Sequence, residues 1–224
     1  MTGWCNGSEL DAGWIKVDAA NGNLYLFLAG NLESNFNKLE IFIDCVPGAG
    51  QNEVRSDNPD VDYNGLSRMG RDTTNNFPGL KFDSGFAADF FITTTLGNPG
   101  SNVATQFANI AQMLTDGGGV GAYVGNGVFT DSATGSNLLN DQVYGCKMSI
   151  NNSNTSGVSG DSANAGSGCG ITTGIEIMIP LVLTGWDGVS DIKVCAFING
   201  QGHDYADRKS TRLNSSHVSE SRMP

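Results

Sequence analysis

Alternation of apolar and polar positions dominates the chain and predicts β-strands. Residues 38–44, KLEIFID, place Leu39, Ile41 and Ile43 on one face, and residues 174–181 repeat this pattern. A period of two residues is what a half-buried antiparallel strand requires. The other segments that we expect to form strands are 23–30, 86–95, 146–150 and 191–198.

Two of these segments carry apolar residues in a way that predicts their place in the sheet. Both faces of residues 23–30, NLYLFLAG, are apolar, so we expect a central strand. Residues 86–95 are expected to place Phe86, Ala88, Phe90 and Ile92 along a single face.

One segment departs from the strand period. Residues 101–118 carry Val103, Phe107, Ile110 and Leu114 at helical spacing, with cap residues at both ends, and predict a surface helix. The glycine-rich residues 117–127 are expected to form a strand and a turn, and the polar residues 151–168 a long loop. The predicted fold class is all-β: one antiparallel β-sandwich of jelly-roll type over residues 1–206, with one short surface helix.

The last residues of the chain do not resemble the rest. Residues 207–224, DRKSTRLNSSHVSESRMP, look like the translation of a DNA-sequencing adapter, and we expect both native termini to lie outside this chain. Without them the chain has 8 basic and 21 acidic residues and a net charge of −13. Such a charge disfavours nucleic acid as a partner. No apolar run of about 18 residues is present, so no membrane span is expected in this fragment.

Four segments together resemble family 9 carbohydrate-binding modules and the related DOMON-like sandwiches. They are NLYLFLAG, NKLEIFID, GIEIMIPLVLTG and DIKVCAFING, and the matching residues are Glu40, Phe42, Asp44, Glu176, Ile179 and Pro180. The chain is also similar to exported bacterial surface proteins of unknown function. The resemblance implies a β-sandwich, an extracellular or cell-surface location, and a polysaccharide or cell-surface glycan as partner. Trp4, Trp14 and Trp186 do not match a sugar-binding tryptophan pair.

An acidic segment, DNPDVDYNGL, raises the question of a metal site. Asp60, Asp62, Asn64 and Gly65 reproduce the first half of a calcium-binding loop, but Arg71 stands where that loop needs a bidentate glutamate. The alternative is a turn whose side chains cap their own backbone. The candidate Ca²⁺ ligands are Asp57, Asp60, Asp62, Asn64 and Asp72.

The five cysteines allow one disulfide to be proposed. Cys146 and Cys169 bracket the long polar loop, and a bridge there would contribute about 3 kcal/mol in the chain-entropy model. The alternative is a set of buried, reduced thiols. Cys5, Cys45 and Cys195 cannot be paired from the sequence.

Few residues are candidates for catalysis. His203 is the one histidine outside residues 207–224, and no G-x-S-x-G motif accompanies it, so we expect a surface or turn residue. Glu40 and Glu176 could approach each other as a glycosidase pair if they lay on one sheet. We expect both to be solvated strand residues instead, and no catalytic residue is predicted.

Aromatic residues in loops are the remaining candidates for ligand binding. Tyr63 and Trp186 are the two that we single out, because an exposed aromatic ring can stack on a sugar; the alternative for Trp186 is a ring folded over the end of the sandwich. The predicted function is an exported, non-catalytic binding or surface module for glycans, stabilised by calcium. The alternatives are a structural or adhesive surface protein without a small ligand, and an enzyme acting on polysaccharide.

Overall fold

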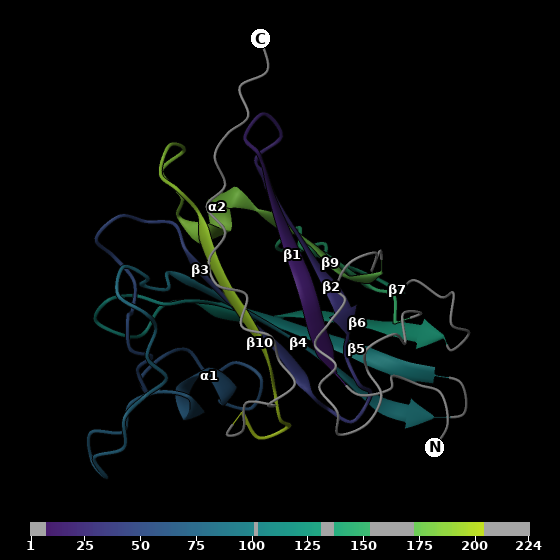
Figure 1. The fold of residues 1–224 in the computed structure, drawn as a ribbon, viewed down its shortest axis with the longest axis horizontal. Helices are drawn as coiled ribbons and strands as arrows, with labels where there is room; N and C mark the ends of the chain where they lie inside the picture. The colour runs from purple at the N-terminus through teal and green to yellow at the C-terminus, as the bar shows by residue number, and fades with distance from the viewer. Residues whose placement is uncertain (1–7, 101–102, 131–136, 153–172, 204–224) are drawn as a thin grey trace.

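A computed structural model of the chain describes residues 8–100, 103–130, 137–152 and 173–203, and these form two antiparallel sheets (Figure 1). Each sheet has five strands, in the orders β1-β2-β9-β8-β7 and β10-β3-β4-β5-β6. The strands are β1 (Glu9–Asp18), β2 (Asn23–Asn31), β3 (Lys38–Asp44), β4 (Phe90–Gly100), β5 (Val103–Gln112), β6 (Gly121–Thr130), β7 (Asn137–Asn140), β8 (Lys147–Ile150), β9 (Gly174–Pro180) and β10 (Lys193–Asn199). The predicted all-β sandwich is confirmed.

Helices contribute little to the fold. Those in the described ranges, α1 (Gly65–Arg68) and α2 (Leu181–Thr184), span four residues each. Neither has the length or the apolar run that would let a helix cross a membrane.

The main core lies between the two sheets. Alternate residues of each strand point into it, so Leu24, Leu26 and Leu28 of β2 and Leu39 and Ile41 of β3 are at most 3% exposed. The predicted strand faces are confirmed here. Burying side chains of this size contributes about 1.5–3 kcal/mol each, which makes the interlayer contact the main source of stability.

The helix predicted over residues 101–118 is wrong, because most of this segment forms strand β5. Ala104, Ala108 and Ile110 face the core at a period of two residues, and β4 and β6 pair with β5 on either side. Backbone hydrogen bonds along both edges hold the segment extended. Helices in proteins gain most of their stability from tertiary packing, so a few apolar residues at helical spacing did not determine the local structure.

A second apolar cluster covers part of the outer face of the sheet β10-β3-β4-β5-β6. Phe42 of β3 lies at its centre, with ring centroids 5.0 Å from Phe82 and 5.1 Å from Phe91. The segment between β3 and β4, which contains α1, supplies most of the covering side chains. They are Val54, Val61, Leu66, Met69, Phe82, Phe86 and Ala88.

This cluster corrects the expectation that residues 86–95 present a single face. Phe86 and Ala88 pack in the outer cluster, whereas Phe90 and Ile92 pack between the sheets. Strand β4 begins only at Phe90, so the two pairs belong to different structures and need not share a face.

The cysteines of the described ranges do not support the predicted disulfide. Cys146 is a free thiol that is fully buried, and Cys169, like Cys5 and residues 207–224, lies outside the described residues. Cys45 is also a free buried thiol, and its Sγ lies 3.5 Å from the carbonyl oxygen of Thr184. Burial raises the pKa of each of these two thiols to about 12. Both are therefore protonated and unreactive at neutral pH.

We expect Cys45 and Cys146 to resist alkylation by iodoacetamide in the folded protein and to react after unfolding in the absence of a reductant. Mass spectrometry of the peptides that carry each residue measures this. If Cys146 reacts only after reduction, it forms a disulfide, and the free-thiol assignment is wrong.

Candidate ligand-binding site

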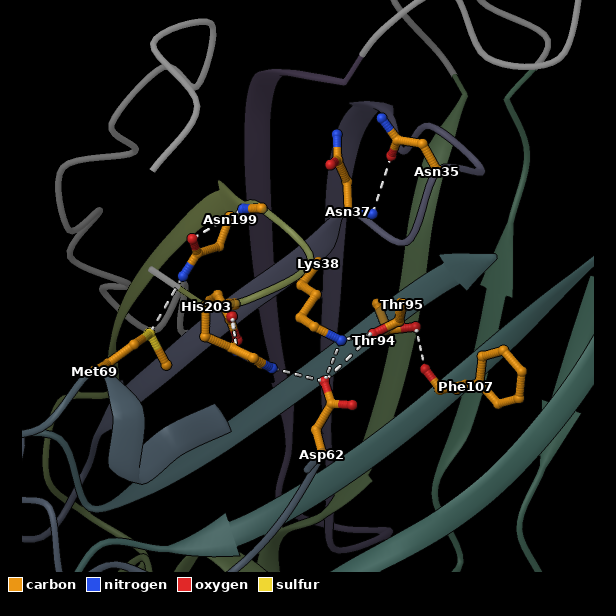
Figure 2. Close-up of polar contacts among 12 residues, drawn as sticks. Asn35, Asn37, Lys38, Asp62, Met69, Thr94, Thr95, Phe107, Asn199 and His203 are labelled. Carbon is orange, nitrogen blue, oxygen red and sulfur yellow. Dashed lines mark hydrogen bonds and ion pairs between the residues drawn. The ribbon is translucent and has the colours of Figure 1, made fainter. Parts of the chain in front are cut away.

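Four charged side chains form a buried chain on the outer face of β3. His203 Nδ1 lies 2.6 Å from Glu40 Oε1, and His203 Nε2 lies 3.1 Å from Asp62 Oδ2. Lys38 Nζ lies 2.8 Å from the same Asp62 oxygen and donates a hydrogen bond of 3.0 Å to Thr95 Oγ1. None of the four charged side chains is more than 6% exposed. Figure 2 shows Lys38, His203 and Thr95 converging on the Asp62 carboxylate.

The alternation of β3 places two members of this charged cluster. Since Leu39 and Ile41 point between the sheets, Lys38 and Glu40 point outward. Asp62 comes from the turn that precedes α1, and His203 from the turn that follows β10. Three segments that are far apart in the sequence therefore meet at one point on the sheet.

The charges of the cluster compensate one another. Burial alone would lower the pKa of His203, but the interactions with the Asp62 and Glu40 carboxylates outweigh burial and raise the pKa to about 9. Burial would raise the pKa of Asp62, yet His203 and Lys38 together hold it below its ordinary value. At neutral pH His203 is thus a cation, and acids and bases alternate along the cluster.

The turn that carries Asp62 has an unusual backbone. Asp62, Tyr63 and Asn64 have φ values of 48°, 57° and 63°, so three successive residues are left-handed. This conformation costs about 1–2 kcal/mol for a side chain such as that of Tyr63. The Asp62 ion pairs and a 2.9 Å hydrogen bond from the Gly65 N–H to the Val61 carbonyl hold the turn in place. Strain of this kind persists where the surroundings dictate the backbone, often at functional sites.

Gly65 allows His203 to approach the turn. A Cβ atom at Gly65 would overlap the imidazole ring of His203, so the ring packs directly on the glycine backbone. The absence of a side chain at this position is therefore required for the cluster.

A groove of about 520 Å³ opens above Lys38 and Asp62, and we call it the Tyr63 groove. Tyr63 and Tyr123 line it with side chains that are 87% and 53% exposed, respectively. Strands β4 and β5 contribute polar groups and a further ring. The lining residues are Phe36, Lys38, Asp62, Tyr63, Thr95, Phe107, Asn109 and Tyr123.

The two predicted ligand-binding residues, Tyr63 and Trp186, lie in different parts of the structure. Tyr63 lies in the groove, and its role in binding stays a prediction. Trp186 lies in the turn after α2, where its Nε1 donates a 2.8 Å hydrogen bond to the Ser190 carbonyl and its ring packs against the main core. Trp186 is not among the lining residues of the Tyr63 groove.

The candidate calcium ligands are engaged in separate interactions. Asp62 belongs to the charged cluster, and Asp57 forms a 2.6 Å ion pair with Arg55. Asp72 accepts hydrogen bonds from the backbone of its own turn. Asp60 and Asn64 are exposed. Within the described ranges no group of three or more His, Cys, Asp or Glu side chains is placed to hold a metal ion, and the calcium site stays a prediction.

The exposure expected for Glu40 is wrong, because this strand residue is 0% exposed. His203 lies in a turn, which is one of the two placements expected for it, but it is only 3% exposed. Glu40 and Glu176 cannot form a pair on one sheet, because β3 and β9 belong to different sheets. The outward Phe42 and the apolar residues between β3 and β4 were the sequence signals that the outer face of β3 would be covered.

Comparison of the chain with protein-family models, with curated proteins and with solved structures found no match.

We expect the protein to lose stability as the pH rises from about 6.5 to about 9, because folded His203 keeps a proton that the unfolded chain releases near its ordinary pKa. Urea unfolding at several pH values measures the slope, with His203→Gln as the comparison. The variant should be less stable and should lack this part of the slope. An unchanged slope in His203→Gln would show that His203 is not protonated in the folded state.

Gly65→Ala should destabilise the protein by about 1–3 kcal/mol, because the new methyl group displaces the His203 ring. The same unfolding assay measures the loss. Its pH dependence should also flatten if His203 leaves its partners. A variant with the stability of the parent chain would contradict the close packing of Gly65 and His203.

Proposed function

We propose that this chain is a non-catalytic module that binds a neutral saccharide in the Tyr63 groove. The carrying observation is that two exposed tyrosines, Tyr63 and Tyr123, line the same groove as a set of buried polar groups. Ligand sites combine apolar surfaces with a few placed polar groups in this way. Aromatic rings suit the C–H faces of sugars, and the polar groups suit their hydroxyls.

The charge of the groove supports a neutral ligand. Lys38 and Asp62 reach the groove, but each already neutralises the other at 2.8 Å. An ionic ligand would have to compete with this pair for its own partner. Thr95 and Asn109 offer uncharged hydrogen-bonding groups to a hydroxylated ligand.

The same geometry supports binding over hydrolysis. Glycoside hydrolysis requires two carboxyl groups on either side of the bond, one of them protonated as the acid. Asp62 is the one carboxylate among the described lining residues of the groove, and its partners lower its pKa. Asp62 is therefore poorly suited to donate a proton.

The wider setting of the proposal is an exported or cell-surface protein. The resemblance to family 9 carbohydrate-binding modules and DOMON-like sandwiches supports this setting, together with the glycine-rich loops and acidic composition. Calcium does not enter the proposal, because Asp62, at the centre of the predicted loop, is bonded to Lys38 and His203.

We expect wild-type protein to bind one or more neutral oligosaccharides on a glycan array, and Tyr63→Ala and Tyr123→Ala each to weaken that binding about tenfold. Loss of one stacked ring accounts for a change of this size. Titration calorimetry with the best array ligand measures the affinities, and the products are then analysed for cleavage.

Phe77→Ala is the matched control, because Phe77 is 66% exposed and is not a lining residue of the groove. This variant should bind as the wild type does. The proposal fails if no neutral saccharide binds, if both tyrosine variants bind normally, or if the ligand is hydrolysed.

A further inference from the structure

The outer face of the sheet β1-β2-β9-β8-β7 carries a second groove, of about 740 Å³. Strand pairing sets its outward side chains in two rows across four strands. One row is Trp14, Phe27, Glu176 and Ser149, and the other is Lys16, Tyr25, Met178 and Lys147. We call this surface the Trp14 platform.

Two aromatic side chains of the Trp14 platform are open to solvent, and a third, Phe27, is partly exposed. Trp14 is 52% exposed and Tyr25 is 38% exposed, and the Trp14 and Phe27 ring centroids are 5.3 Å apart. On the opposite sheet, outward aromatic residues such as Phe42 are covered by the second apolar cluster. The platform has no such cover among the described residues. Solvent-facing strand positions are ordinarily polar, so adjacent exposed rings indicate a binding surface.

Two lysines give the platform a charge opposite to that of the whole protein. Lys16 and Lys147 are exposed, and neither forms an ion pair with a described residue. In contrast, Lys38, Arg55, Arg71 and Lys193 all do. The chain has 8 basic residues outside residues 207–224, and four of them form ion pairs with described carboxylates. Two of the remaining four lie on this platform. This placement favours an anionic ligand, although the chain without residues 207–224 has a net charge of −13.

We propose that the Trp14 platform binds an acidic polysaccharide, a chain of sugar rings that carry carboxylates. Lys16 and Lys147 stand at the two ends of one row, three strand spacings or about 14 Å apart at the backbone. An extended glycan crossing the strands can stack its rings on Trp14 and Tyr25 and place carboxylates at both lysines.

In this proposal Glu176 favours hydroxylated ligands and disfavours ligands of high negative charge density. Its exposed carboxylate lies in the neighbouring row, between Phe27 and Ser149, where it accepts hydrogen bonds from sugar hydroxyls. It also repels ligands of high charge density such as nucleic acid. The platform thus suits a ligand with spaced negative charges and many hydroxyls, and it is a site distinct from the Tyr63 groove.

The test uses hexagalacturonate, with a neutral hexasaccharide of galactose as the uncharged probe. Wild-type protein should bind hexagalacturonate more tightly than the neutral probe, and binding should weaken as salt is raised. The double variant Lys16→Gln/Lys147→Gln should bind about tenfold more weakly, because each exposed ion pair contributes up to about fivefold. Trp14→Ala should lower the affinity by a similar factor.

Lys81→Gln is the matched control, since it removes the charge of an exposed lysine outside the platform and should leave binding unchanged. Thermal melting confirms that each variant is folded, and Tyr63→Ala separates this site from the Tyr63 groove. The proposal is overturned if hexagalacturonate does not bind, if its binding is insensitive to salt or to the two lysines, or if sedimentation shows that the platform joins two copies of the chain.

Discussion

The alternating chain of buried charges, Glu40–His203–Asp62–Lys38, is the interaction on which the candidate ligand-binding site depends. Breaking a buried pair by removing one partner costs about 3–5 kcal/mol, because the remaining charge has no solvent to replace the lost contact. Each member of this cluster comes to the sheet from β3 or from a distant turn. The ion pairs therefore keep the two turns against the strand, and with them the left-handed backbone that exposes Tyr63.

The two outer faces of the sandwich differ in whether their outward apolar side chains are covered. A strand with apolar residues on both faces needs cover on both sides, and the segment between β3 and β4 provides it for Phe42. Strand β2 has the same two-sided pattern, but its outward rings, Tyr25 and Phe27, lie in an open groove. The sheet β10-β3-β4-β5-β6 therefore has a polar groove, the Tyr63 groove, beside its apolar cover. The sheet β1-β2-β9-β8-β7 has an exposed aromatic surface, the Trp14 platform, with a lysine at each end of one row. The proposed ligands differ accordingly, a neutral saccharide for the first and an acidic one for the second.

The pattern of apolar residues predicted the local structure correctly where it reflected only which side of a strand faces the core. In 38–44 and 174–181 the alternation reports only which side faces the core, and the strands formed as expected. The pattern misled where two constraints competed. Residues 101–118 have apolar spacings that fit a helix, yet most of the segment forms β5, which pairs with β4 and β6. Glu40 was expected to be solvated because charged groups ordinarily are, and its pairing with His203 makes burial acceptable.

The sequence by itself determined the all-β class, most of the strands and their core faces, because these follow from the period of the side chains along the backbone. It did not determine which outer face would be covered, nor that Lys38, Glu40, Asp62 and His203 would meet. Those outcomes depend on contacts between segments up to 163 residues apart, as for His203 and Glu40. No local spacing encodes such contacts. The tertiary structure decided them, since a buried charge is stable only where the fold brings its partner within hydrogen-bonding distance.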